Sequence, residues 1–172
     1  AEKKGYLVPE GMKRNALNDL SRIARNWKPE ASYSAESEEM TQAYRLFVLA
    51  LGQVAEVGAM NRLKESKTLM SMSRYLLAAG YALVGRPDVS KELVVKTTAL
   101  TTACSGYDQT FGSDLRDASI RLMTLCLLDG GKEAALLANE ISKTLASDDW
   151  LSTQSTAFSL VALSDYMEKY KM

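Results

Sequence analysis

The sequence predicts an all-α protein made of stacked helical hairpins. Apolar residues recur at three- and four-residue spacing in segment after segment, which is the spacing of one face of an α-helix. Glycine, proline and serine clusters separate these segments. An alternating strand pattern is lacking, apart from a short extended piece expected near residues 107–111. These observations predict helices joined by turns and loops.

The first two helices are expected in the N-terminal third of the chain. The Val8-Pro9-Glu10 start puts proline at an early helical position and glutamate in the first turn. Pro29 ends this helix, and a polar link covers Ser32–Glu38. One apolar stripe marks the first helix: Met12, Ala16, Leu20, Ile23 and Trp27. The core face predicted for the second helix consists of Met40, Tyr44, Phe47, Leu51 and Val54.

Further helices are expected along the rest of the chain. A turn at Gly85-Arg86-Pro87-Asp88 combines a glycine stop with a proline restart, and Ser113 ends a loop rich in threonine, serine and glycine. Ser152 or Thr153 can cap the last helix, and Trp150 and Leu151 precede it, where an apolar residue can staple the incoming chain. The expected ranges are about 57–64, 68–84, 88–100, 114–128, 133–146 and 153–170.

Two types of helix alternate along the chain. One type is apolar on nearly all sides, as expected of helices enclosed by others: residues 43–51, 76–84, 118–128 and 157–163. The other type is amphipathic, with one face for water: residues 12–27, 88–100 and 133–146. Inner and outer helices in alternation give stacked hairpins, and hairpins curled round an axis form an α/α toroid.

Composition excludes several classes of function. Lysine plus arginine equals aspartate plus glutamate, 21 each, so no net field indicates a nucleic acid or a membrane surface as partner. No apolar run reaches the roughly 18–20 residues of a membrane span. The chain has neither an initiator methionine nor a signal-peptide pattern, so we expect a piece of a longer polypeptide.

The chemistry available to the chain is limited. Histidine is absent, which removes the commonest general base and the commonest metal ligand. Cys104 and Cys126 lack the close pairing of zinc or redox motifs. Cys126 lies in an apolar run, so we expect a buried free thiol, with a Cys104–Cys126 disulfide as the alternative. No cofactor, metal or catalytic residue is predicted.

Four segments stand out in order along the chain: residues 43–51 with 58–63, residues 76–85, residues 107–117, and the run Trp150-Leu151-Ser152-Thr153-Gln154-Ser155-Thr156-Ala157. In this order they resemble the helical thioester-type domain of bacterial alpha-2-macroglobulin-like proteins, and the last run is similar to one near the end of that domain. The resemblance covers most of residues 40–166.

The resemblance implies a scaffold role for this chain. Residues 1–172 would form part of a terpene-cyclase-like α/α toroid, the second half of the thioester-type domain. The parent would be an exported protein of the periplasm or cell envelope that traps proteases. Its other domains would be the partners of this segment, and proteases would be reached through the parent. The family's Cys-x-Glu-Gln thioester motif matches neither cysteine here, so it lies upstream or the parent lacks it.

Three groups of residues are candidates for a more specific role. Asp148-Asp149 suggests a metal or acid pair, but helix capping before Thr153 is the better interpretation. A charged cluster at a helix start is interpreted as a structural ion pair: Asp114, Arg116 and Asp117. Three aromatic residues are candidate domain contacts, against the plainer interpretation of core or loop anchors: Tyr107, Phe111 and Trp150.

Two other classes of function remain open. An α/α-toroid enzyme of the terpene-cyclase or glycosidase type would need convergent carboxylates on inner helices, and no good pair is seen. A free-standing helical-repeat binding module would have capping helices with polar outer faces. Half of a toroid would leave apolar surface at its cut edge, so self-association is expected, with Ile23 and Trp27 on the candidate edge.

Overall fold

The computed structural model describes residues 5–29, 35–67, 69–98 and 113–171. Within these ranges the chain forms eight helices and no strand, so the all-α prediction is confirmed. The helices are α1 (Glu10–Asn26), α2 (Ala35–Leu51), α3 (Val57–Lys64), α4 (Ser71–Leu83), α5 (Pro87–Thr98), α6 (Asp114–Leu127), α7 (Gly131–Leu145) and α8 (Thr153–Tyr170). The short extended piece expected near residues 107–111 lies outside the described residues.

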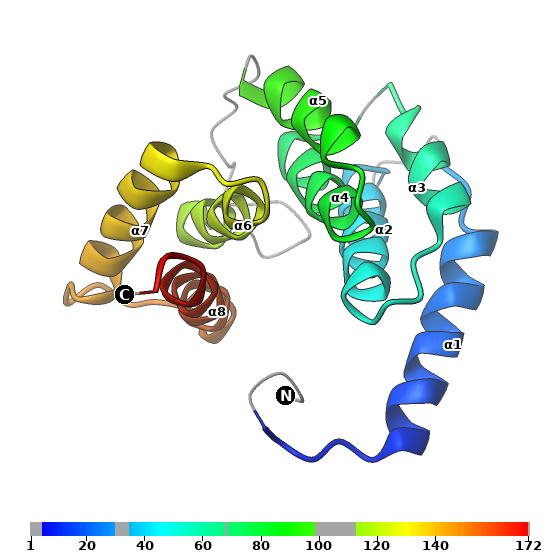
Figure 1. The fold of residues 1–172 in the computed structure, drawn as a ribbon, viewed down its shortest axis with the longest axis horizontal. Coiled ribbons are helices and arrows are strands. Elements are labelled where there is room, and N and C mark those ends of the chain that lie inside the picture. Colours follow the sequence, from blue (N-terminus) through cyan, green and yellow to red (C-terminus); the bar gives the residue numbers. More distant parts are fainter. Residues whose placement is uncertain (1–4, 30–34, 68, 99–112, 172) are drawn as a thin grey trace.

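Four of the helices form an inner row: α2, α4, α6 and α8 (Figure 1). Each packs against the next, while α3, α5 and α7 connect them along the outer side. Ser113 and Ser119 of the α6 segment contact Ser155 and Ser159 of α8 at 2.6 and 3.0 Å between hydroxyl oxygens. Residue numbers rise together on both helices, so α6 and α8 run parallel. Each intervening outer helix therefore runs back, which is the hairpin arrangement expected.

The inner row curves. Its first and last helices meet on the concave side, where the rings of Tyr44 on α2 and Phe158 on α8 lie 6.1 Å apart, edge to face. Such an arrangement is a favourable one for aromatic pairs. Phe47 extends the contact, since its ring lies 6.5 Å from that of Tyr44. The row is therefore an arc with an aromatic contact at its centre.

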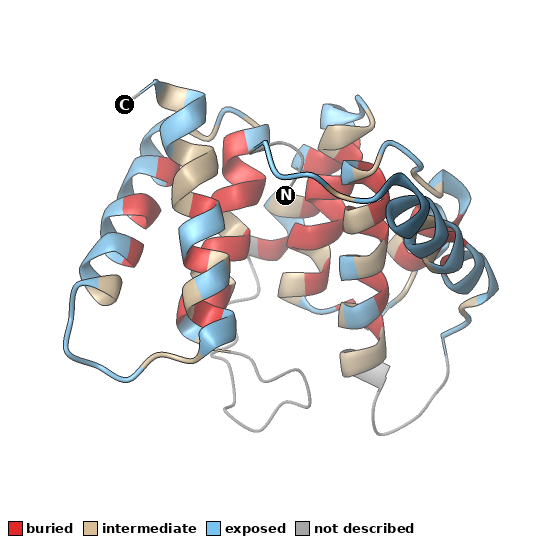
Figure 2. Ribbon diagram, turned by 90° about the horizontal axis from the view of Figure 1, so that it is seen from below, coloured by how far each residue is buried: buried red, intermediate tan, exposed pale blue. Residues whose placement is uncertain are grey.

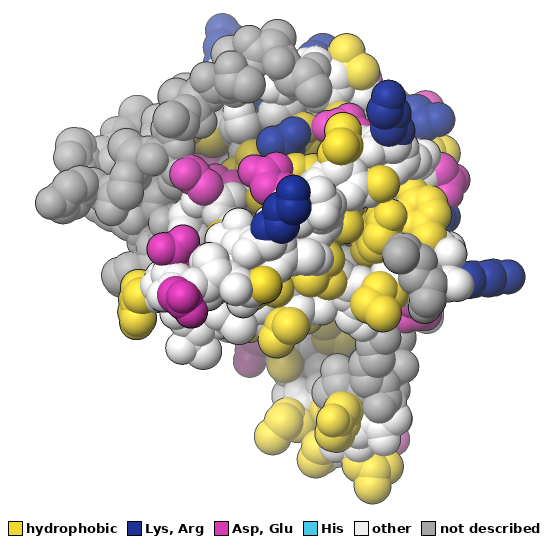
Figure 3. All heavy atoms as spheres, turned by 90° about the vertical axis from the view of Figure 1, so that its left-hand side faces the viewer, with side chains coloured by type: hydrophobic (Ala, Val, Ile, Leu, Met, Phe, Trp, Pro, Cys, Tyr) yellow, Lys and Arg dark blue, Asp and Glu magenta, His cyan; other side chains and the backbone are white. Residues whose placement is uncertain are grey.

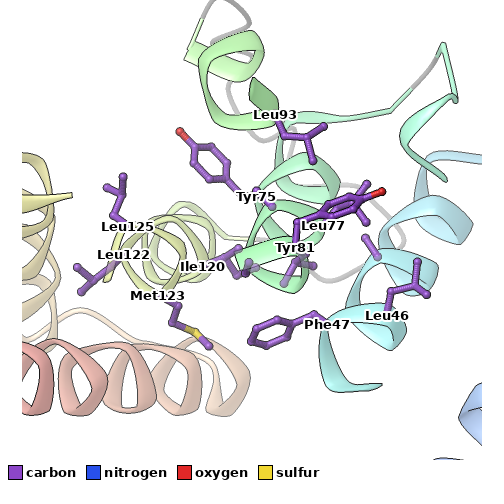
Figure 4. Packing of buried hydrophobic residues seen from close by; sticks show 14 of the residues in the cluster. Leu46, Phe47, Tyr75, Leu77, Tyr81, Leu93, Ile120, Leu122, Met123 and Leu125 are labelled. Atoms are coloured by element: carbon purple, nitrogen blue, oxygen red, sulfur yellow. The ribbon is translucent and has the colours of Figure 1, made fainter. Parts of the chain in front are cut away.

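The core lies between the helices of this row and between the row and the outer helices. Figure 4 shows Ile120 on the side of α6 that faces α4, and Leu122 and Leu125 on the opposite side, toward α7. Buried residues concentrate along the inner helices and are sparse on α1 (Figure 2). At Gly80 an added Cβ would stand 3.2 Å from the Met60 Cε atom and 3.9 Å from the Phe47 Cα atom. A residue this small lets α4 approach the backbone of α2.

Several helix starts follow the sequence signals. Pro9 precedes α1, as the Val8-Pro9-Glu10 pattern predicts. Ser113 caps α6 by accepting the Arg116 N–H at 3.1 Å, and Ser152 caps α8 by accepting the Ser155 N–H at 3.1 Å.

The apolar stripe predicted for α1 is only partly buried. Ser21 and Ala24 are the buried residues of this helix, and Leu20 and Trp27 are half-buried. Met12 is 66% exposed and Ile23 40% exposed. The helix is rotated because its neighbours among the described residues are α2 and α3, which contact one flank of the stripe.

The core face predicted for α2 is also rotated. Tyr44 is 45% exposed, and Leu51 and Val54 are 51% and 42% exposed, the last of these beyond the end of the helix. Gln42 is fully buried instead, because its side-chain amide donates to the Ala24 carbonyl at 3.1 Å and accepts from Arg45. A polar residue with partners can occupy a core position that periodicity reserves for apolar ones.

Candidate domain-contact surface

Among the described residues, no group of three or more histidine, cysteine, aspartate or glutamate side chains could hold a metal ion. None of the described helices is long and apolar enough to cross a membrane. Cys126 is a free, buried thiol, and burial raises its pKa to about 11. Such a thiol is unreactive at neutral pH, because the thiolate is the nucleophile.

Trp150 stands out as an exposed aromatic side chain, with 87% of its surface accessible. It lies in the loop between α7 and α8, which is held by short-range hydrogen bonds. The Ser147 hydroxyl lies 2.8 Å from the Thr144 carbonyl oxygen and 3.1 Å from the Asp149 carboxylate. The interpretation of Trp150 as a core or loop anchor is therefore wrong within this chain. Of the two apolar residues expected to staple the start of α8, Leu151 is half-buried and packs against the core, so Leu151 rather than Trp150 fits that role.

One of the two acidic residues of this loop, Asp149, stabilises its turn. The cap of α8 is Ser152, so the interpretation of Asp148-Asp149 as a helix cap is wrong. Asp149 instead pairs with Ser147, whose hydroxyl also accepts the Asp149 N–H at 3.3 Å. The short Ser147 side chain reaches these groups because they lie only two residues away.

The loop that carries Trp150 lies near the N-terminal ends of α6 and α8. The 2.6 Å contact between Ser113 and Ser155 brings these two helix starts together. Figure 2 shows the loop between α7 and α8 as an exposed segment at the lower edge of the molecule. The other two candidate contact residues, Tyr107 and Phe111, lie outside the described residues.

The charged cluster near the start of α6 contains an ion pair between a buried arginine and a half-buried aspartate. Arg116 is 3% exposed, and its guanidinium Nη2 lies 2.8 Å from the Asp117 Oδ1 atom. This pair agrees with the structural role expected from the sequence. Asp114, the third member of the cluster, is exposed in the first turn of α6, where a negative charge is favourable.

A second surface was missed by sequence reasoning. We define the outward face of α8 as Ala157, Leu160, Val161, Ser164 and Met167. Leu160, Val161 and Met167 are 58%, 50% and 52% exposed, so the expectation that residues 157–163 are enclosed is wrong within this chain. Figure 3, which views the side of α7 and α8, shows hydrophobic side chains exposed among charged ones. The signal was present, since a helix apolar on all sides needs neighbours on all sides.

Comparison with known proteins rests on structure alone. No protein-family model matches this chain, and no curated protein sequence does. Native alpha-2-macroglobulin from Escherichia coli, in a structure from domain MG7 to the C-terminus, matches 97% of this chain at 21% identity, with a TM-score of 0.76. The chain has the fold of a helical part of these proteins. It covers 28% of that solved chain.

Other solved states show the same likeness. Trypsin-activated alpha-2-macroglobulin from Escherichia coli matches 97% of this chain at 22% identity, with a TM-score of 0.71, and this chain covers 12% of it. Salmonella alpha-2-macroglobulin reacted with methylamine matches 96% at 21% identity, with a TM-score of 0.74, and this chain covers 11% of it. The chain therefore spans a small part of the proteins whose fold it shares.

Proposed function

We propose that this chain is a scaffold segment of a bacterial alpha-2-macroglobulin-like protease trap. In this proposal residues 1–172 are the second half of the helical thioester-type domain, a partial α/α toroid. The observation that carries the proposal is the match of the curved helical row to alpha-2-macroglobulin structures over 97% of the chain. The segment itself performs no bond chemistry, and the parent protein acts outside the cytoplasm.

Likeness to several states supports a rigid role for the segment. The TM-score is 0.76 against the native protein and 0.71 against the trypsin-activated one, so the same helical arrangement is present in both. In a trap that closes after cleavage, domains move while the row of helices keeps its packing. A close-packed core transmits such movements without deforming.

Trp150 is the proposed contact between this segment and a neighbouring domain. An exposed tryptophan on a hydrogen-bonded loop offers a large apolar surface at little further entropic cost on binding, which is typical of interface hot spots. Tyr107 and Phe111 are proposed to contribute to the same surface, because the helix that follows them begins beside α8. The partner is another domain of the parent chain.

Entrapment of trypsin by the full-length polypeptide tests the proposal. After incubation, we expect trypsin to keep its activity on a small chromogenic ester and to lose activity on a large protein substrate. Residues 1–172 alone should change neither activity, because they provide no bait and no enclosing chamber. Full activity on the protein substrate with trypsin, and with a panel of other proteases, would contradict the proposed function.

The proposed contact has its own test. Trp150→Ala in the full-length polypeptide should weaken entrapment or lower its melting temperature, since truncation of a hot-spot tryptophan costs about 2 kcal/mol or more. Leu136→Ala is the matched control, because Leu136 is an exposed apolar residue (62%) on the outer helix α7. An equal response of the two variants would show that Trp150 faces solvent in the parent.

A further inference from the structure

The turn between α6 and α7 contains the one place in the sequence where a glycine follows an aspartate or an asparagine, Asp129-Gly130. Among aspartyl bonds, one to glycine rearranges most readily, because glycine has no side chain to shield its own nitrogen. Asp129 lies in the left-handed region at φ 57°, and its side chain is 77% exposed. The turn therefore places a chemically labile bond at the surface.

The rearrangement of such a bond uses only the chain and water. The Gly130 nitrogen attacks the side-chain carboxyl carbon of Asp129, and the carboxyl hydroxyl leaves as water with the proton of that nitrogen. The product is a five-membered succinimide. Water then opens the ring at either carbonyl, which restores aspartate or gives isoaspartate, in which the chain continues through the side chain and the former backbone carbonyl becomes the free carboxylate.

The folded turn restrains the attacking nitrogen. The Gly130 N–H donates to the Leu125 carbonyl oxygen at 2.8 Å. The attack requires this nitrogen to lose its proton and the peptide group to rotate towards the Asp129 side chain, and either change breaks the bond. An added Cβ at Gly130 would stand 2.7 Å from the Leu125 Cβ atom, so the close packing leaves little room for that rotation.

The last turn of α8 restrains the carboxyl group. The Lys169 ammonium lies 2.5 Å from the Asp129 carboxylate, and the Tyr170 hydroxyl accepts the Gly131 N–H at 3.1 Å. We call these two contacts the latch. The hydrogen bond and charge of Lys169 lower the pKa of Asp129, and an ionised carboxylate is a poor target because it has no hydroxyl to lose as water. An exposed ion pair is weak, so the latch can open while the core stays folded.

We propose that Asp129 is a site of isoaspartate formation and that the latch sets the rate of this modification. Isoaspartate lengthens the backbone before Gly130 by one carbon atom and displaces the carboxylate, so the modified turn cannot re-form both contacts of the latch. A transient local opening thereby becomes a permanent loss of contact between α8 and the α6–α7 turn. This inference is independent of the proposed function.

Ageing of the full-length polypeptide in heavy-oxygen water at neutral pH tests the proposal. Each passage through the succinimide adds one heavy oxygen to the peptide that contains Asp129. Mass spectrometry measures this label, and chromatography separates the isoaspartyl peptide from the aspartyl one. We expect labelling about tenfold faster or more in guanidinium chloride than in the folded protein, because the folded turn must open first. Lys169→Gln should accelerate labelling of the folded protein several-fold, and Tyr170→Phe should accelerate it less.

Three variants are controls, each checked for folding by circular dichroism. Asp129→Glu should abolish the label, because a glutamate would have to close a larger, less favourable ring. Lys143→Gln removes an exposed lysine near the far end of α7 and should keep the wild-type rate. Ser90→Ala removes a buried hydrogen bond from α5 to the Ala78 carbonyl of α4 and should keep it too, which separates opening of the latch from a loss of global stability.

Other outcomes overturn the inference. Equal labelling of the folded and unfolded wild-type chain would show that the turn gives no protection, and no labelling of either would remove the site. If Lys169→Gln labels at the wild-type rate, or Ser90→Ala is accelerated equally, the latch does not set the rate.

Discussion

At the scale of single residues, two glycines illustrate how the space around a residue determines the effect of a substitution on stability. An added Cβ at Gly130 would stand 2.7 Å from the Leu125 Cβ atom and 3.1 Å from its carbonyl oxygen, and the Gly130 N–H closes the end of α6 on that carbonyl at 2.8 Å. Gly130→Ala should therefore lower the free energy of unfolding by about 1–3 kcal/mol. Gly58→Ala in α3 meets no atom within 4 Å and should raise it by up to about 1 kcal/mol. Urea denaturation of both variants measures the contrast, and equal effects would contradict the packing at Gly130.

Two buried acids make stability depend on alkaline pH. Burial raises the pKa of Cys126 from 9.0 to about 11 and that of Tyr81, whose hydroxyl donates to Asn61 at 2.6 Å, from 10.0 to about 12. The unfolded chain loses these protons first, so the free energy of unfolding should fall as pH rises from about 9 and stop falling from these groups above about 12. Melting temperatures between pH 8 and 11 measure the effect. Cys126→Ala should flatten the fall that starts near pH 9, while Tyr6→Phe, at an exposed tyrosine, should leave it unchanged. A profile identical to wild type for Cys126→Ala would show that the thiol is solvated.

At the scale of helices, the contact of α6 with α8 depends on small side chains. Ser159 is fully buried, donates to the Ser155 carbonyl at 2.8 Å and meets Ser119 at 3.0 Å. Ser159→Ala keeps the space but removes the hydrogen bond to a carbonyl that the helix also uses and the contact with the Ser119 hydroxyl, so it should cost about 1 kcal/mol. Ser159→Leu must push the helices apart and should cost about 1–3 kcal/mol or more. The difference between their urea midpoints checks this. A leucine tolerated as well as the alanine would mean that the helices are not in close contact.

The helices also show which features of the fold could be predicted from the sequence and which could not. Helix starts were predictable, because caps such as Ser113 and Ser152 satisfy N–H groups of their own first turn. The buried face of each helix was harder to predict. Gln42 is buried because its side chain finds hydrogen-bond partners in Arg45, on the same helix, and in Ala24, on another helix. Ile23 and Tyr44 are partly exposed because rotation of α1 and α2 depends on which helices pack on them. Periodicity predicts a helix and its apolar side, but it does not predict which other helices pack against that side.

The candidate contact surface shows the same division. The absence of histidine limited the chemistry that the sequence could suggest, but it left the position of a contact surface open. Trp150 was a candidate contact from the sequence, yet the sequence favoured an anchoring role that its exposure contradicts. Helix α8 is apolar on all sides in sequence, and only the position of α8 at the end of the row shows which side is open.

At the scale of the whole molecule, α1 and α8 each carry exposed apolar side chains. Within the described part of the chain, α1 packs on α2 and α3 alone, and Figure 1 shows it on the opposite side of the molecule from α8. Its exposed flank contains Met12 and Ile23. Apolar edges of this kind on an isolated chain usually find a partner. Residues 1–172 alone are therefore expected to self-associate as their concentration rises.

Charge placed on the α1 edge tests this expectation. Because Ile23 is 40% exposed, Ile23→Asp should weaken self-association while changing the free energy of unfolding by only about 0.5 kcal/mol, the usual range for surface substitutions. Ser21→Asp is the contrasting variant, since Ser21 is buried against the neighbouring helices, and it should destabilise the fold instead. Sedimentation velocity over a concentration series measures association, and urea denaturation measures stability.

Adding the remainder of the parent helical domain should also suppress self-association, because it covers the same edges. A wild-type chain that stays monomeric at high concentration, with Trp27 shielded from quenchers, would show that the arc closes on itself.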